Sequence, residues 1–131
     1  PYMEALLENL AKCCSDKTEI PKLVQEEKIK ALPVQFIRGK TIDDILVVEE
    51  AQNLTKEEML AILTRLGKTG KIVVNGDPTQ IDLLNKNMSG LVRSKELLGH
   101  LNEIAVVDFD HSDVVRHPLV SKIVKAYSNN D

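Results

Sequence analysis

Acidic and amide side chains follow two apolar stretches of the chain, in a pattern that suits magnesium and phosphate chemistry. The stretch ILVVEEAQN places Glu49 and Glu50 directly after four apolar residues, and Gln52 follows two positions later. The stretch KIVVNGDPTQ places Asp77 and then Gln80 after a similar apolar run. Mg²⁺ takes oxygen ligands from carboxylates, phosphates and water, and a carboxylate or amide can orient the water that attacks a γ-phosphate. The two stretches therefore favour a site for nucleotide hydrolysis.

A structural explanation of these acids is also open. A strand end is often polar because the chain leaves the core there, and an acid at that point can cap the next helix. A third apolar stretch, EIAVVDFD, ends in Asp108 and Asp110 and has the same ambiguity. In open α/β sheets, however, ligands bind at the carboxyl ends of the strands. The amide that follows the acid at the first two strand ends is what favours nucleotide chemistry.

Apolar periodicity predicts helices and strands that alternate along most of the chain. Such alternation indicates an α/β fold with a parallel sheet, and the continuous apolar runs are typical of strands with helices on both faces. Thr55 and Glu58 form a capping-box pattern at a helix start, and Ser89 is expected to cap a later helix. Helices are expected over residues 3–14, 20–30, 55–66, 89–98 and 118–127, and strands over 34–39, 44–50, 71–77 and 103–110.

Length and composition are those of one globular domain. The 131 residues include 43% hydrophobic and only 3% aromatic residues, so the core is expected to be aliphatic. One domain is predicted over 1–131, with a helical lead-in at 1–33, a β/α core at 34–127 and a tail at 128–131. The net charge of −3 gives no global attraction to nucleic acid or anionic membrane. No apolar run could span a bilayer, and the adjacent Cys13 and Cys14 are interpreted as reduced thiols, so a cytoplasmic location is expected.

The quoted motifs resemble those of a known family. VVEEAQN resembles the Walker B motif of PhoH-like ATPases, and NGDPTQIDL resembles their GDxxQ motif, which superfamily 1 helicases share. The stretches PYMEAL, FIRGKTIDD, SGLV and DVVRHPLVSKIVKAY are similar to the same family in the same order. The resemblance covers nearly the whole chain. It implies part of a P-loop NTPase sheet of the RecA or helicase-like kind, with ATP and Mg²⁺ as ligands. It also implies an association with RNA and with helicase or ribonuclease-type activity.

The chemistry of these side chains, together with the resemblance, predicts roles for individual residues. Glu49 and Glu50 would hold Mg²⁺, Glu50 would act as the base or water-orienting group, and Gln80 would sense the γ-phosphate. Arg116 would contact phosphate in its own or a neighbouring subunit, although a salt bridge with Asp113 or Asp108 is an open alternative. Glu49 departs from the family pattern, which has Asp at this position. The six predicted site residues are Glu49, Glu50, Gln52, Asp77, Gln80 and Arg116, of which Glu50, Gln52, Asp77 and Gln80 fall at the family's nucleotide-site positions.

No phosphate-binding motif of the form GxxxxGK[ST] occurs in the sequence, and GKTGK at residues 67–71 is interpreted as a basic turn. In the family this loop lies upstream of the position of Pro1. The chain is therefore expected to be the C-terminal part of a PhoH-like ATPase, without its Walker A strand. Alone, it is expected not to hydrolyse ATP, and to self-associate or shift its last strand. The alternative is a non-catalytic interaction module that keeps the fold and binds a partner protein.

Overall fold

The computed structural model describes residues 2–16, 18–110, 113 and 118–128. The chain divides into two compact units, Pro1–Leu98 and Gly99–Asp131. The first unit contains the sheet and most of the helices, and the second contains α5 (Pro118–Ser128). At its start, α1 (Tyr2–Cys13) and α2 (Glu19–Gln25) contact each other. Both confirm predicted helices, although α2 ends five residues before the predicted boundary.

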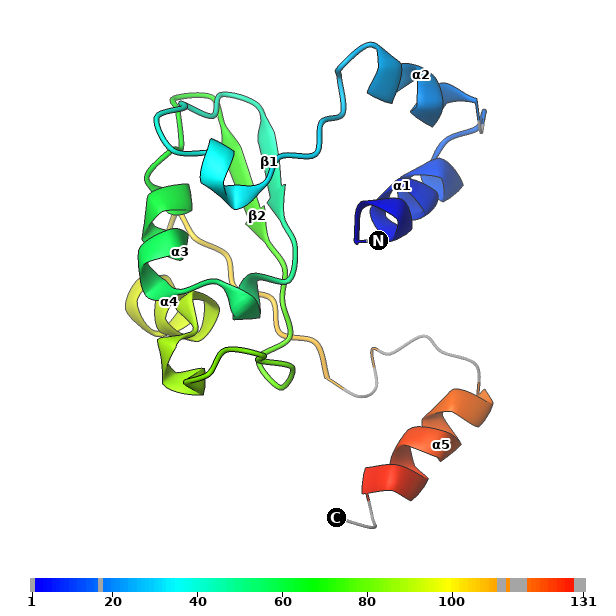
Figure 1. Ribbon diagram of the computed structural model, residues 1–131, viewed down its shortest axis with the longest axis vertical. Helices are drawn as coiled ribbons and strands as arrows, with labels where there is room; N and C mark the ends of the chain where they lie inside the picture. Colours follow the sequence, from blue (N-terminus) through cyan, green and yellow to red (C-terminus); the bar gives the residue numbers. More distant parts are fainter. Residues whose placement is uncertain (1, 17, 111–112, 114–117, 129–131) are drawn as a thin grey trace. The chain divides into compact units, whose positions relative to one another are not determined.

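Two parallel strands form the sheet of the first unit (Figure 1). Strand β1 (Ile45–Val48) pairs with β2 (Lys71–Val74), with Ile45 opposite Lys71 and Val48 opposite Val74. Between them the chain passes through the short 3₁₀ turn η2 (Ala51–Asn53) and helix α3 (Lys56–Leu63). This crossover is what allows the two strands to run in the same direction. The predicted α/β class and parallel pairing are confirmed.

Helix α3 begins at the predicted capping box. The Glu58 backbone N–H donates to Thr55 Oγ1 at 3.2 Å, and the Thr55 N–H donates to Glu58 Oε2 at 2.9 Å. These two bonds satisfy backbone donors that the first helical turn leaves open. They also set the direction in which the chain enters α3 after the end of β1.

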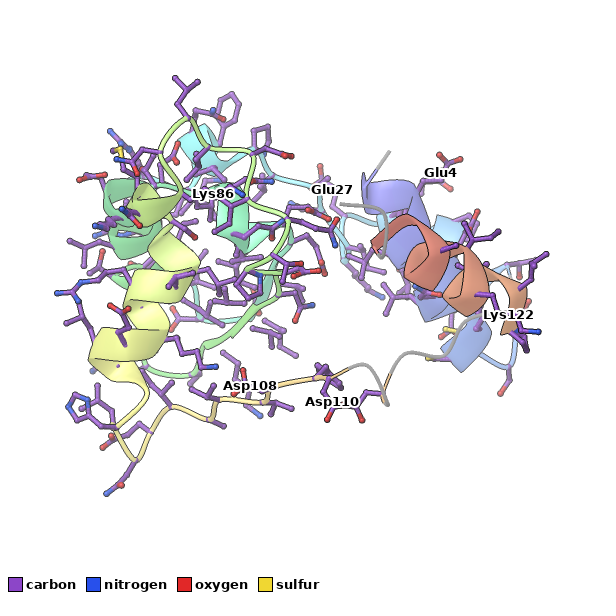
Figure 2. The ribbon with its side chains drawn as sticks, turned by 90° about the horizontal axis from the view of Figure 1, so that it is seen from below. Glu4, Glu27, Lys86, Asp108, Asp110 and Lys122 are labelled. Atoms are coloured by element: carbon purple, nitrogen blue, oxygen red, sulfur yellow. The ribbon has the colours of Figure 1, made fainter. Side chains whose placement is uncertain are left out.

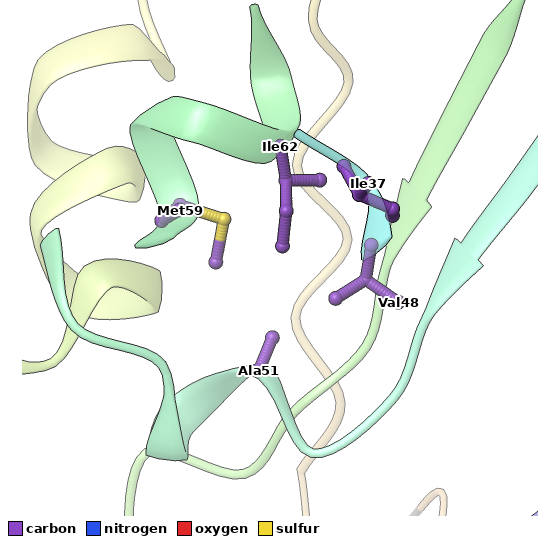
Figure 3. Close-up of a cluster of buried hydrophobic side chains, with 5 residues drawn as sticks. All are labelled: Ile37, Val48, Ala51, Met59 and Ile62. Carbon is purple, nitrogen blue, oxygen red and sulfur yellow. The ribbon is translucent and has the colours of Figure 1, made fainter. Parts of the chain in front are cut away.

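The core lies between α3 and one face of the sheet (Figure 3). Met59 and Ile62 of α3 are fully buried, and they pack with Val48 of β1, with Ala51 and with Ile37. The core is aliphatic apart from the thioether of Met59, as the composition predicts. The surrounding half-buried residues are Val34, Leu46, Leu54, Leu63, Ile72, Val74 and Leu91.

The other face of the sheet is exposed in this structure. Side chains alternate between the two faces of a strand, so Ile45, Val47 and Val73 point away from α3. Their exposed fractions are 71%, 39% and 45%. Within the Pro1–Leu98 unit, the core residues of α3 pack on the inner face of the sheet. We call Ile45, Val47 and Val73 the outer sheet face.

Helix α4 (Gly90–Leu98) packs on α3 through a close backbone contact. The Gly90 N–H donates to the Leu54 carbonyl at 2.7 Å, and a Cβ at position 90 would lie only 2.6 Å from the Met59 Cβ. Only glycine allows this approach. The predicted Ser89 cap is wrong, since the buried Ser89 Oγ has no hydrogen-bond partner among the described residues.

Two predicted strands are not strands in the structure. Residues 34–36 form the 3₁₀ turn η1 (Val34–Phe36), because the Phe36 N–H bonds back to the Pro33 carbonyl at 2.9 Å. Residues 104–110 form neither helix nor strand and have no strand partner among the described residues. Figure 2 shows Asp108 and Asp110 on this segment before α5. The apolar composition of both segments favours strands, but a strand also needs a neighbour with which to exchange backbone bonds.

A short 3₁₀ turn, η3 (Lys86–Met88), precedes α4. None of the helices described here has the length and apolar character that crossing a membrane requires.

The buried position of Ile62 leads to a stability prediction. Ile62→Ala should lower the free energy of unfolding by about 2–5 kcal/mol, because it removes buried methylene groups and leaves a cavity. Leu60, which is 64% exposed on the same helix, is the matched control. Leu60→Ala should change stability by no more than about 0.5 kcal/mol. Urea unfolding followed by circular dichroism gives both values, and equal losses would contradict this assignment of the core.

The capping box leads to a second prediction. Thr55→Ala should lower the free energy of unfolding by about 1 kcal/mol, because the Glu58 N–H loses its acceptor at the start of α3. Thr55→Ser keeps the hydroxyl and should retain most of that stability. Thermal unfolding of the two variants would measure the difference. If both variants lose the same amount, the cost comes from the lost methyl group and not from the cap.

Candidate functional site

The pairing of the strands brings their two acidic ends together. Val48 lies opposite Val74, so the residues after β1 and those after β2 leave the sheet side by side. The Asn75 N–H donates to the Val48 carbonyl at 2.8 Å, and the Ala51 N–H donates to the Asn75 carbonyl at 2.9 Å. The strand pairing thus continues past the last strand residues and fixes the two exits relative to each other.

The side chain of Gln52 lies at the centre of these exits. It is only 1% exposed. Its Nε2 donates to Glu50 Oε2 at 2.7 Å and to the Gln80 carbonyl at 3.3 Å. Its Oε1 accepts from the Asp77 backbone N–H at 3.1 Å. One buried amide therefore joins the acid after β1 to the turn after β2.

Gly76 makes room for this amide. A Cβ at position 76 would lie 2.7 Å from Gln52 Oε1 and 2.7 Å from Leu91 Cδ2. Carbon atoms do not approach this closely without displacement, so a larger residue would push Gln52 or Leu91 away. The glycine of the GDxxQ-like stretch thus has a packing role beside Gln52.

Glu50 has an unusual backbone conformation. Its φ of 54° and ψ of 36° are in the left-handed region, which residues with a Cβ rarely adopt. The Asn53 N–H donates to the Glu50 carbonyl at 3.0 Å, and the Gln52 side chain binds the Glu50 carboxylate. The surrounding hydrogen bonds therefore maintain a conformation that is unfavourable by itself.

Asp77 organises the turn that follows β2. Its Oδ1 accepts from the Thr79 hydroxyl at 2.7 Å and from the Thr79 N–H at 2.8 Å. Its Oδ2 accepts from the Gln80 side-chain amide at 2.6 Å. These hydrogen bonds favour the charged form and lower the pKa of Asp77 below its ordinary value. In this structure the Gln80 amide is thus bound to Asp77.

Two further amides, Asn75 and Asn53, support the site, and neither was predicted as a site residue. Asn75 Nδ2 donates to Glu49 Oε1 at 3.2 Å, and Asn53 Oδ1 accepts from the Asp82 N–H at 2.8 Å. Their position directly after the acidic strand ends was visible in the sequence. Their partners lie 26 and 29 residues away in the chain, so no local pattern could assign them.

The two glutamates can supply part of a magnesium site. Glu49 and Glu50 are exposed and consecutive, and an amide engages one oxygen of each. No group of three His, Cys, Asp or Glu side chains that could hold a metal occurs among the residues that the structure describes. This donor set fits Mg²⁺, which commonly binds to one or two carboxylates together with phosphate and water. It does not fit a metal ion held by protein ligands alone.

The structure brings together four of the six predicted site residues: Glu50, Gln52, Asp77 and Gln80. Glu49 lies at the same strand end, bound to Asn75. Arg116 lies outside the described residues. Asp108 and Asp110, the acids of the third apolar stretch, belong to the Gly99–Asp131 unit.

Comparison with known proteins agrees with the motifs at this site. The sequence pattern of the family described as PhoH-like protein matches residues 1–128. A PhoH-like protein of Bacillus subtilis is 41% identical over 133 residues, which cover 100% of this chain and 41% of the relative. A PhoH-like protein of Mycobacterium leprae is 43% identical over 129 residues, which cover 98% of this chain and 37% of the relative.

A more distant relative, Protein PhoH of Escherichia coli K12, is 36% identical over 102 residues. That match covers 77% of this chain and 29% of the relative. The chain thus spans about two fifths of the length of its more similar relatives. Since the family pattern covers nearly every residue, including both acidic strand ends, the chain belongs to the PhoH-like protein family.

Proposed function

We propose that this chain forms the Walker B side of an ATP- and Mg²⁺-dependent hydrolytic site in a longer PhoH-type ATPase. One observation carries the proposal: Gln52 joins Glu50 to the turn of Asp77 and Gln80 at the carboxyl edge of a parallel sheet. Ligands of α/β sheets bind at this edge. Family membership supports an ATPase-related protein. Links to RNA, helicase or ribonuclease-type activity and the cytoplasm belong to the same proposal and rest on the resemblance.

The residues have distinct proposed roles. Mg²⁺, when bound with ATP, would neutralise charge on the phosphate oxygens, and Glu49 and Glu50 would hold it through their exposed carboxylates. Glu50 would also orient the attacking water and accept its proton. Gln80 would leave Asp77 and sense the γ-phosphate, whereas Asp77 shapes the turn that carries Gln80. Arg116 would contact phosphate, because a guanidinium keeps its charge and offers two donors to phosphate oxygens.

Backbone strain at Glu50 supports a functional rather than a structural use of this acid. Strained conformations persist where the surrounding structure enforces them, and they cluster at functional sites. A helix-capping acid would need no left-handed conformation, and the side chain of Glu50 accepts no bond from η2 backbone N–H groups. Thr55 caps α3 instead. This distribution of roles argues against a purely structural explanation of the Glu50 carboxylate.

The isolated chain is proposed to lack activity. Its sequence contains no GxxxxGK[ST] loop, whose backbone N–H groups and lysine hold the β- and γ-phosphates in P-loop enzymes. Without such a cradle, the carboxylates of Glu49, Glu50 and Asp77 repel the phosphates.

A second candidate is a non-catalytic module that binds a partner protein or a second copy of the chain. The outer sheet face of Ile45, Val47 and Val73 favours it, because parallel sheets usually have both faces covered.

ATP turnover tests the first candidate. In the complete reading frame, Glu50→Gln should lower kcat by about 100-fold or more, because the water loses its proton acceptor. The isolated chain should show no turnover above the blank. Glu57→Gln, which removes the same charge from the exposed first turn of α3, is the matched control and should leave kcat unchanged. Unchanged kcat in Glu50→Gln would refute the assigned site, and Glu50-dependent turnover by the isolated chain would refute its proposed inactivity.

Strain at Glu50 leads to a separate prediction about stability. Glu50→Gly should be more stable than Glu50→Ala by about 1 kcal/mol, because glycine adopts the left-handed conformation without a Cβ clash. Both variants lose the carboxylate, so their difference isolates the backbone. At the exposed Leu60 in the right-handed α3, the order should be reversed, with glycine less stable than alanine by about 1 kcal/mol. Urea unfolding measures both pairs, and the same order at both positions would contradict the strain.

A further inference from the structure

We propose that Gln52 is a positioning residue that makes the Glu50 carboxylate and the turn of residues 77–80 move as one unit. This inference rests on the proposed function, since it concerns how the same site is set. The resemblance places Gln52 among the residues that contact nucleotide. The geometry points to a different role, in which Gln52 acts only through Glu50 and through the turn.

The hydrogen bonds of Gln52 leave little capacity for a nucleotide. A glutamine amide has two N–H donors and one carbonyl acceptor. Both donors have partners, Glu50 Oε2 and the Gln80 carbonyl, and the acceptor is bound by the Asp77 N–H. The side chain is 1% exposed, so a ligand at the surface would not reach it.

The hydrogen bond from Gln52 to Glu50 fixes the orientation of the Glu50 carboxylate. At 2.7 Å it is short for an amide donor, as expected when the acceptor is an ionised carboxylate. It engages one carboxylate oxygen, Oε2, and leaves Oε1 without a partner among the described residues. A carboxylate held in this way presents its second oxygen in one direction, and such orientation accounts for much of the effect of a general base.

The two bonds to residues 77–80 tie the position of the Gln52 amide to the position of the turn that follows β2. Gln52 binds the backbone at both ends of this turn, at Asp77 and at Gln80. Gly76 lies close to the amide, since a Cβ at position 76 would be only 2.7 Å from Gln52 Oε1. If Gln80 moves toward a γ-phosphate, the turn and the Gln52 amide move together, and the Glu50 carboxylate is redirected. The proposed sensor and the proposed base are thus mechanically linked through one side chain.

Gln52→Glu tests this link, because it keeps the shape of the side chain and the acceptor for the Asp77 N–H but removes both donors. In the complete reading frame we expect kcat for ATP to fall by about tenfold or more, with KM changed by less than about threefold. Gln25→Glu, the same chemical change at an exposed position of α2, is the matched control and should keep both constants. Active sites are counted by titration with a tight-binding nucleotide analogue. This count shows whether a lower activity reflects a lower kcat per site or a smaller amount of folded protein.

The outcomes distinguish this inference from the proposed function. If wild-type protein shows no turnover, or if Glu50→Gln has no effect, the proposed function fails. If Glu50→Gln removes activity but Gln52→Glu keeps kcat per active site, Gln52 is merely structural and the inference is overturned. A raised KM with unchanged kcat would indicate direct nucleotide contact and would overturn it as well.

A second variant keeps the test valid if Gln52→Glu folds poorly. Combining it with Glu50→Gln exchanges the amide and the carboxylate of the pair. The amide at position 50 can then donate a hydrogen bond to the carboxylate at position 52. In the 131-residue chain, the double variant should therefore regain stability relative to Gln52→Glu in urea unfolding, while the full-length double variant remains inactive. A double variant no more stable than Gln52→Glu would disprove the bond on which the inference depends.

Discussion

One buried amide holds the candidate site of this protein together. Gln52 binds the carboxylate of Glu50 on one side and the backbone of Asp77 and Gln80 on the other. If these hydrogen bonds were lost, buried polar groups would be left without partners. Such groups destabilise a protein by more than an ordinary surface hydrogen bond stabilises it. Two loops that follow different strands are therefore held in one arrangement. Gly76 completes the arrangement by leaving room for the amide.

The core determines where this amide lies. Ala51 is fully buried beside Val48, Met59 and Ile62, and it immediately precedes Gln52 in the chain. Packing of α3 on the inner sheet face thus fixes the backbone that carries Gln52. The capping box at Thr55 then directs the chain into α3. Stability and site geometry share these residues, so core substitutions near Ala51 should disturb the site even when they leave the acids in place.

Family membership indicates an ATPase-related protein but does not identify its substrate or partners. The chain belongs to the PhoH-like protein family, and it spans 41% of its Bacillus subtilis relative. The proposed Walker B role rests on the acids and amides at the two strand ends and on the left-handed backbone of Glu50. The resemblance implies an aspartate where this chain has Glu49, whose carboxylate extends one methylene further. Its bond to Asn75 limits where that longer side chain can go.

Local patterns in the sequence predicted much of the fold. The apolar runs identified β1 and β2, the 3.6-residue periodicity identified α1, α3 and α5, and Thr55 with Glu58 identified the start of α3. These features depend on interactions between residues a few positions apart. The segments at 34–39 and 103–110 were wrongly predicted as strands. Apolar composition does not reveal whether a neighbouring strand is present.

The sequence by itself determined which residue types stand at the two acidic strand ends. The motif resemblance grouped Glu50, Gln52, Asp77 and Gln80 as residues of one expected nucleotide site. Only the tertiary structure decided how they are connected. Gln52 meets Asp77 and Gln80 across 25 and 28 residues of chain, and Glu50 takes a left-handed conformation that is rare for its residue type. Such contacts arise from strand register and from the packing of α3, which involve residues far apart in the chain. For that reason the sequence alone could not show that Gln52 joins the two loops that follow β1 and β2.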